Sequence, residues 1–149
     1  MQLSDVILPT NVLCNVSAPS KVKLLHALAS KASKGFDVTE EVIFEALDRR
    51  ENLGSTGIGL GIAVPHATIS ELTDIFILVC RLGKAIDFEA IDGEPVDLIF
   101  LLLVPVNRKS EYLTILAAIA RHMRADGVLE AIRKADTADQ IYIALTDGR

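Results

Sequence analysis

One histidine of the chain stands where a side chain is free to meet a reactant. His66 follows Pro65 at the end of a short apolar run, residues 62–64, and it is part neither of a helix face nor of a regular buried alternation. An imidazole at such a place can act as a nucleophile or exchange protons near neutral pH. The same arrangement also fits a loop histidine beside a turn-forming proline, with no chemical role.

The segment before this histidine is rich in glycine and suited to holding an anion. Four glycines fall within eight residues, so backbone N–H groups can approach a phosphate closely, and two hydroxyl groups add donors. A tight turn or bulge that requires small residues would explain the same composition without a ligand. We expect a loop that feeds a short strand, with a candidate phosphate-binding set of Gly54, Ser55, Thr56, Gly57, Gly59 and Gly61.

Two familiar nucleotide-binding motifs do not fit this segment. A Walker A loop requires a Lys-Ser/Thr pair after its last glycine, whereas Gly61 is followed by Ile62. The dinucleotide-binding motif places its third glycine one position later and continues into a helix, whereas an apolar strand is expected here. Nucleotide hydrolysis and dinucleotide binding are therefore not indicated.

Arg50 precedes His66 by sixteen residues and lies at the predicted end of a helix. Its guanidinium group could clamp phosphate oxygens with a fork of N–H donors. The alternative is a solvated cation that is favourable at a helix C-terminus, a role that the adjacent Arg49 would fill equally well. No Ser-His-Asp or Cys-His ordering is evident near these residues.

The other histidines and the cysteines indicate no second reactive site. His26 lies in the first predicted helix and His122 in the third, where each fits a residue at the helix surface or its boundary. Cys14 and Cys80 are too far apart in sequence for a disulfide framework or a zinc knuckle, and they are typical of small apolar residues. We expect no metal and no other cofactor.

Length and charge narrow the classes of protein. The chain has 149 residues, half of them apolar, which suits one domain over residues 1–149. Its 15 basic and 20 acidic residues give a net charge of -5 without a Lys/Arg block, which argues against nucleic acid or an anionic membrane as the main partner. The longest strongly apolar stretch, 98–104, is too short to cross a bilayer. The first residues lack signal-peptide features, so a cytoplasmic location is expected.

Helical periodicity predicts five helices, each preceded by a residue that can begin one. The first is expected to end at Gly35 and the second near Arg50. Two β-prone apolar runs, 75–80 and 96–104, are typical of strands covered on both faces. Helices, then strands, then helices predict an α/β fold with an α+β-like order, in which a mixed β-sheet is flanked by helices on both sides. The expected helix starts are Ser20, Thr39, Ser110, Asp126 and Thr137, and the expected inner face of the third helix is Leu113, Leu116, Ala117 and Ala120.

The stretch from Arg50 to His66 resembles the phosphorylation-site segment of the fructose/mannitol-type enzyme IIA (EIIA) domains of the bacterial phosphotransferase system (PTS). The full run Arg-Glu-Asn-Leu-Gly-Ser-Thr-Gly-Ile-Gly-Leu-Gly-Ile-Ala-Val-Pro-His is far more specific than any piece of it. The resemblance continues through 85–97 and 101–105 into the third predicted helix. Within that family the chain is most similar to the stand-alone nitrogen-regulatory (Ntr) branch, whose members lack an attached transporter domain.

This resemblance implies a function and a fold. His66 would accept a phosphoryl group from an HPr-like histidine phosphocarrier protein and hold it as a tele-phosphohistidine, and Arg50 would be the arginine that clamps the phosphate there. The family fold is a mixed β-sheet flanked by helices, in agreement with the prediction above. Members of the nitrogen branch act chiefly as regulators whose phosphorylation state decides which proteins they bind, including potassium-transport and signalling components.

Tyr112 departs from the family pattern and leaves two alternatives open. Many members carry a second histidine at this position, whereas a phenol with a pKa of about 10 cannot change charge at neutral pH. The first alternative is a sugar-specific (fructose/mannitol) EIIA that passes phosphate to a IIB domain. The second is a non-catalytic regulatory binding module whose glycine segment is purely structural. The composition neither requires nor excludes a homodimer.

Overall fold

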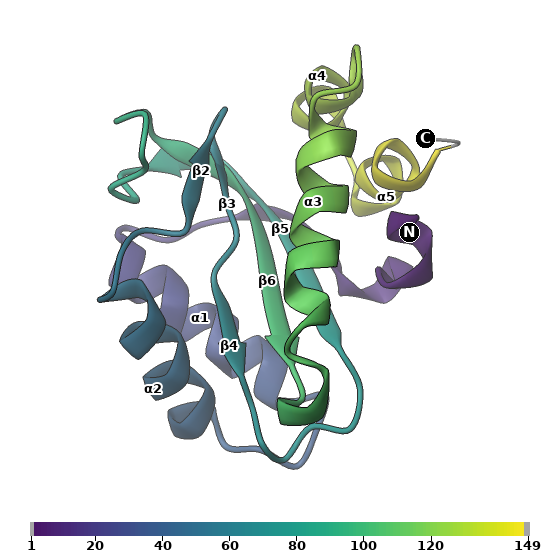
Figure 1. Ribbon diagram of the computed structural model, residues 1–149. Helices are drawn as coiled ribbons and strands as arrows, with labels where there is room; N and C mark the ends of the chain where they lie inside the picture. Colours follow the sequence, from purple (N-terminus) through teal and green to yellow (C-terminus); the bar gives the residue numbers. More distant parts are fainter. Residues whose placement is uncertain (1, 148–149) are drawn as a thin grey trace.

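A six-stranded mixed β-sheet forms the centre of the molecule, and helices cover both of its faces (Figure 1). This computed structural model describes residues 2–147, so the predicted domain limits at 1 and 149 lie outside the described residues. The predicted α/β single domain, with a mixed sheet between helical layers, is confirmed.

The sheet contains two long strands and four short ones. The long strands are the two predicted apolar runs, although the first continues well beyond residue 80. The strands are β1 (Val12–Val16), β2 (Gly57–Gly59), β3 (Ile62–Ala63), β4 (His66–Thr68), β5 (Phe76–Ile86) and β6 (Val96–Val104). Their order is β1-β5-β6-β3-β2, and β4 pairs with β6 next to β3; β6 runs antiparallel to β5 and parallel to β3 and β4.

Among residues 2–147, four of the α-helices begin directly after the predicted residue, whereas the fourth helix follows Gly127 and not the expected Asp126. Ser110 precedes the third helix without a side-chain cap. The oxygens of Ser20, Thr39 and Thr137 each accept a hydrogen bond from the backbone N–H three residues later, which confirms these three caps. Within residues 2–147 the α-helices are α1 (Lys21–Ser33), α2 (Glu40–Glu51), α3 (Glu111–Met123), α4 (Val128–Lys134) and α5 (Ala138–Thr146).

The two faces of the sheet contribute to two separate hydrophobic clusters. Ile99 and Leu101 of β6 pack into the cluster that contains α1 and α2, whereas Phe100 and Leu102 pack into the cluster that contains α3, α4 and α5. Successive residues of a strand point to opposite faces, so a central strand covered on both sides must be apolar at every position. This explains why the run 96–104 shows no polar alternation beyond Asp97.

Two predictions for α3 are wrong. Leu113 is 66% exposed, and His122, expected at the surface or its boundary, is only 5% exposed. Nε2 of His122 lies 3.0 Å from the carbonyl oxygen of Ala144 and donates to it. The apolar residues of this helix cover a wide arc that includes Leu113 as well as Ile115, so periodicity alone does not select which part of the arc is buried. The residues that α3 buries are Ile115, Ala118, Ile119, His122 and Met123.

The glycine segment and its surroundings also differ from the expected loop. Residues Gly57–Gly59 form β2, which pairs antiparallel with β3 in a tight hairpin. Leu60 in the turn has a φ of 60° and Gly61 a φ of 77°, a left-handed conformation that favours glycine. His66 is not at the end of the strand 62–64 but is the first residue of a further strand, β4. The hairpin therefore delivers the chain into β4 beside β6.

Candidate functional site

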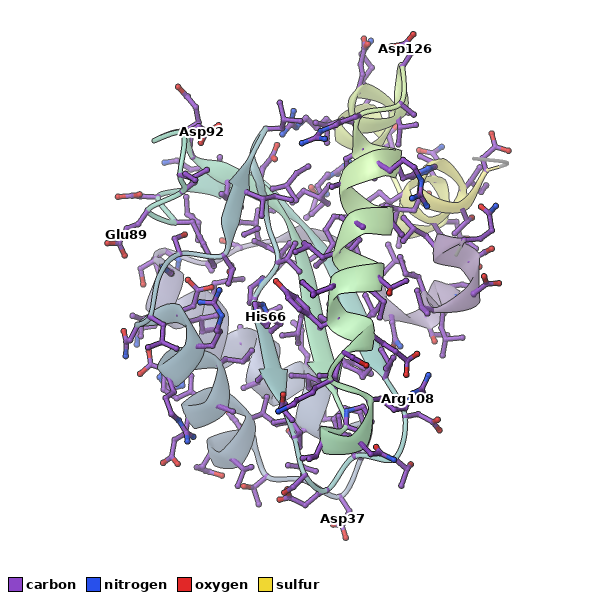
Figure 2. All side chains as sticks on the ribbon, in the orientation of Figure 1. Asp37, His66, Glu89, Asp92, Arg108 and Asp126 are labelled. Carbon is purple, nitrogen blue, oxygen red and sulfur yellow. The ribbon has the colours of Figure 1, made fainter. Side chains whose placement is uncertain are left out.

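His66 is held by the backbone pairing of β4 with β6. It lies opposite Leu102 in the parallel ladder, and the N–H of Leu102 donates to the carbonyl oxygen of Pro65. The imidazole is half-buried and lies between α2 and α3 (Figure 2). A side chain on a paired strand has a fixed direction, which suits a residue that must meet a reacting group at a defined angle.

Both ring nitrogens of His66 have hydrogen-bond partners. Nδ1 lies 3.0 Å from the carbonyl oxygen of Val64, which can only accept, so Nδ1 carries the proton. Nε2 lies 3.1 Å from Nε of Arg50, which can only donate, so Nε2 presents its lone pair. The two contacts select the same tautomer, in which Nε2 is the nucleophilic nitrogen.

Arg50 reaches His66 from the last turn of α2. Its Nη1 donates to the carbonyl oxygen of Gly54 at 2.9 Å, which fixes the plane of the guanidinium group beside the imidazole. The structure thus brings together two predicted site residues that are sixteen positions apart in sequence. Gly54 takes part in the site through this carbonyl oxygen.

The surroundings of His66 keep its ring neutral. Burial lowers the pKa of His66 below its usual value, and the positive charge of Arg50 lowers the pKa further. The hydrogen bond to Val64 and the negative charge of Glu51 oppose this shift. Because the net direction is downward, the nucleophilic neutral form dominates at pH 7.

Tyr112, in the first turn of α3, lies against His66. The ring centroids are 4.0 Å apart and the ring planes are inclined by 23°. Burial raises the pKa of Tyr112, and the charge of Arg50 opposes that shift only in part, so the phenol stays neutral at physiological pH. The position predicted from the family pattern is therefore in direct contact with the candidate nucleophile.

A pocket of about 700 Å³ opens beside the imidazole, between α2, β4 and α3. Arg49 and Lys109 line it together with Arg50, so three cationic side chains border a cavity that is otherwise largely apolar. Sequence reasoning missed Lys109 altogether and treated Arg49 as an ordinary solvated cation. Their only signals were an arginine pair at a helix end and a lysine just before a helix start. Such a pocket favours an anionic reactant.

The structure does not bring the remaining glycine-segment residues to this pocket. Ser55 Oγ donates to the carbonyl oxygen of Phe88 and accepts from Gly57 N, and Thr56 bonds through its N–H and hydroxyl to the carboxylate of Glu51. A Cβ on Gly57 would lie 2.7 Å from the Cβ of Ala90, so close packing requires glycine there. Gly59 and Gly61 belong to the hairpin. These contacts favour the structural alternative given by the sequence, a tight turn that requires small residues, over an anion-binding loop.

Among residues 2–147, no group of three or more His, Cys, Asp or Glu side chains is arranged to hold a metal ion. None of the helices in the same range has the length and apolar character needed to span a membrane.

The mixed sheet and the histidine that faces a cationic pocket define a class of protein. The chain belongs to the family of the phosphoenolpyruvate-dependent sugar phosphotransferase system, EIIA 2, whose model matches residues 5–148. It is therefore an EIIA-type component of a phosphotransferase system.

Within this family, the chain is similar over nearly its full length to nitrogen regulatory proteins. The chain is 40% identical over 145 residues to the nitrogen regulatory protein of Bradyrhizobium diazoefficiens, which covers 97% of this chain and 95% of that protein. Its fold matches the crystal structure of the nitrogen regulatory protein IIA-Ntr from Neisseria meningitidis with a TM-score of 0.90 at 28% identity, over 97% of this chain and 99% of that one. The IIA mannitol structure from Escherichia coli shares the fold, with a TM-score of 0.79 at 19% identity over 94% and 99% of the two chains.

Proposed function

We propose that this protein is a nitrogen-regulatory PTS phosphocarrier that accepts a phosphoryl group on His66 from an HPr-like histidine phosphocarrier in the cytoplasm. The observation that carries the proposal is the orientation of the His66 ring. The carbonyl oxygen of Val64 holds the proton on Nδ1, and Nε2 keeps its lone pair beside the guanidinium group of Arg50. The product is a tele-phosphohistidine.

The transfer exchanges one phosphorus–nitrogen bond for another. Nε2 of His66 attacks the phosphorus in line, and the bond to the donor histidine breaks with its electron pair returning to the donor ring. The proton on Nδ1 remains in its hydrogen bond with Val64, so the phosphorylated ring carries a positive charge next to the phosphoryl group. No general base is needed, because the nucleophilic nitrogen carries no proton.

Arg50 has a role before and during this step. In the resting state its Nε–H occupies the lone pair of Nε2 at 3.1 Å, so this hydrogen bond must be released as the phosphorus approaches. The bond from Nη1 to Gly54 tethers the guanidinium group while its other donors turn to the phosphoryl oxygens. Placement and charge are the main contributions that a protein makes to phosphoryl transfer.

Phosphorylation changes the surface that the protein offers to its partners. A phosphoryl group brings about two negative charges at neutral pH, and the positive ring offsets one of them, so phosphorylation adds about one net negative charge. At His66 this change falls in a pocket bordered by Arg49, Arg50 and Lys109 and makes its potential less positive. We propose that regulated targets, such as potassium-transport or signalling components, distinguish the two states in this way.

The proposal is tested by incubation with a phosphorylated histidine phosphocarrier, followed by intact mass and acid-lability analysis. Acid-labile phosphate is expected on the wild type and absent from His66→Ala. The matched control is His26→Ala, because His26 is an exposed histidine on α1 whose ring stacks on Phe44. Wild-type protein that takes no label from several donors, or label that persists in His66→Ala, would refute the proposal.

The sugar-specific alternative keeps the same chemistry but sends the phosphate elsewhere. The family is that of a sugar phosphotransferase system, and the fold is shared with IIA mannitol, which both favour this alternative. The nitrogen regulatory relative favours the proposed function instead, because it is 40% identical over nearly the full length of both chains. Phosphate transfer from labelled protein to a IIB domain of the fructose or mannitol type separates the two. We expect transfer to IIB to be much slower than acceptance from the donor.

A further inference from the structure

Glu51 is a buried carboxylate directly beside a site residue in sequence. Its side chain is only 3% exposed, and it follows Arg50 at the end of α2. Successive helix residues point about 100° apart, so Arg50 and Glu51 face different neighbours. Arg50 turns to His66, whereas Glu51 turns to the start of the hairpin and to α1. A buried carboxylate is costly unless its oxygens are paired, so its partners indicate why it is there.

The partners of Glu51 come from two other segments of the chain. Both carboxylate oxygens lie 3.3 Å from the backbone N of Thr56, and Oε1 also accepts from the Thr56 hydroxyl. Nζ of Lys21, the first residue of α1, lies 2.8 Å from Oε2. One side chain thus joins the end of α2, the start of α1 and the beginning of the glycine hairpin.

These contacts continue to the reactive ring. The carbonyl oxygen of Thr56 accepts from the backbone N of Val64 at 3.0 Å. The carbonyl oxygen of Val64 in turn accepts from Nδ1 of His66, whose Nε2 accepts from Arg50. Because Arg50 and Glu51 are joined by a peptide bond, the contacts form a closed circuit from Glu51 through Thr56, Val64 and His66 back to Arg50.

A closed circuit fixes the acceptor that selects the tautomer of His66. The Val64 carbonyl can hold the Nδ1 proton only if the backbone at Val64 keeps its direction. The N–H on the other side of the Val64 Cα donates to the carbonyl oxygen of Thr56, which restrains that backbone, and Thr56 is in turn bonded to Glu51. Arg50 and Glu51 share the last turn of α2, so movement of Glu51 displaces both partners of the imidazole together. Catalytic geometry is sensitive to displacements of this size.

We propose that Glu51 and Thr56 are positioning residues that hold the Val64 carbonyl at Nδ1 of His66 and thereby keep Nε2 as the nucleophilic nitrogen. They act through Val64 and Arg50 and do not touch the reacting phosphoryl group. Lys21 neutralises the buried carboxylate of Glu51 through an ion pair. The effect on phosphorylation rests on the function proposed above, whereas the effect on the ring tautomer does not.

Two variants separate the contribution of the Glu51 carboxylate from that of the Thr56 hydroxyl. Glu51→Gln keeps the size of the side chain but removes the charge that pairs with Lys21. It also replaces one acceptor oxygen by an N–H₂ group, which cannot accept from the N–H or hydroxyl of Thr56. Thr56→Val keeps the backbone N–H and the ion pair and loses only the hydroxyl bond. The control for the carboxylate change is Glu130→Gln on α4, where an exposed glutamate pairs with exposed Lys134.

The primary measurement is the nitrogen-15 spectrum of the His66 ring at alkaline pH, with no donor protein present. The wild type and Glu130→Gln are expected to show one dominant tautomer with the proton on Nδ1. Glu51→Gln is expected to show a mixture of both tautomers, and Thr56→Val a smaller change in the same direction. The initial rate of phosphorylation at saturating donor should fall by about tenfold in Glu51→Gln, with the donor KM within about twofold, because the displaced ring and not donor docking limits the step.

The outcomes are distinct from those that test the phosphocarrier function. Ring spectra identical to wild type in Glu51→Gln and in Thr56→Val, with both variants folded by circular dichroism, would overturn the positioning role. If Glu51→Gln does not fold, Thr56→Val decides the question by the same spectrum. Wild-type protein that accepts no phosphate would refute the proposed function while leaving the tautomer measurement intact.

Discussion

The ring of Tyr112 covers one face of the His66 imidazole, with 4.0 Å between the ring centroids and 23° between the ring planes. Aromatic carbon on this face excludes water, and burial is the largest cause of the lowered pKa of His66. The family pattern places a second histidine at this position in many members. Here a neutral phenol provides cover without a second titrating group.

Removal of the Tyr112 ring is expected to raise the pKa of His66. Tyr112→Ala exposes the imidazole to water, so the pKa should move up toward its usual value of about 6.5. Tyr112→Phe keeps the stacked ring and is expected to leave the pKa close to that of the wild type. A nuclear magnetic resonance titration of the His66 ring protons measures all three proteins. An equal pKa in the wild type and in Tyr112→Ala would show that the lowered pKa has another origin.

The same shift sets the pH dependence of phosphate acceptance. Only the neutral imidazole attacks, and the pKa of His66 lies below its usual value of 6.5. The rate should therefore stay level from about pH 8 to about pH 6.5 and fall only as the pH drops through the lowered pKa. In Tyr112→Ala the fall should begin at a higher pH. Initial rates are measured for both proteins with the same donor protein, so that any titration of the donor affects both profiles equally. Identical pH profiles of the wild type and Tyr112→Ala would contradict the assignment of His66 as the titrating nucleophile.

Loss of Arg50 should slow transfer by about a hundredfold, the usual cost of removing one preorganised donor from a developing charge. Arg50→Lys is expected to restore little, because an ammonium group cannot contact Nε2 of His66 and the carbonyl oxygen of Gly54 with one planar fork. Arg124→Ala, at an exposed position after α3, is the control. Single-turnover phosphorylation rates give the comparison. A wild-type rate in Arg50→Lys would show that only a positive charge is needed.

The helices and the long strands were predictable because their signals are local. A capping residue followed by apolar residues at helical spacing identified α1, α2 and α5, and unbroken apolar runs identified β5 and β6. The buried face of α3 was not predictable in full, because its apolar residues cover an arc wider than the buried face and its polar His122 is buried. Strand β1 and strand β4 are short and gain their stability from pairing with β5 and β6, which local sequence does not reveal.

The sequence indicated two residues of the candidate site but not the contacts that connect them. The motif singled out His66 and Arg50, and the structure places them within hydrogen-bond distance. The contacts of the glycine segment were not predictable, because anion binding and close backbone packing require the same residue type. The acceptor for Nδ1 is a backbone carbonyl, which carries no side-chain signal in any sequence. Glu51 was overlooked for a similar reason, since its burial depends on α1 and the hairpin meeting at one point.

His122 provides a test of stability that is separate from the chemistry at His66. His122→Ala removes a buried ring and the N–H that donates to the carbonyl oxygen of Ala144, so the free energy of unfolding should fall by about 2 to 3 kcal/mol. His26→Ala removes only an exposed ring stacked on Phe44 and should cost less than about 1 kcal/mol. Urea denaturation measures both variants against the wild type. Both should accept phosphate at the wild-type rate at a temperature where they are folded, because neither side chain contacts the pocket at His66. A loss of acceptance in folded His122→Ala would mean that this core histidine supports the site through α3, whose first turn carries Tyr112.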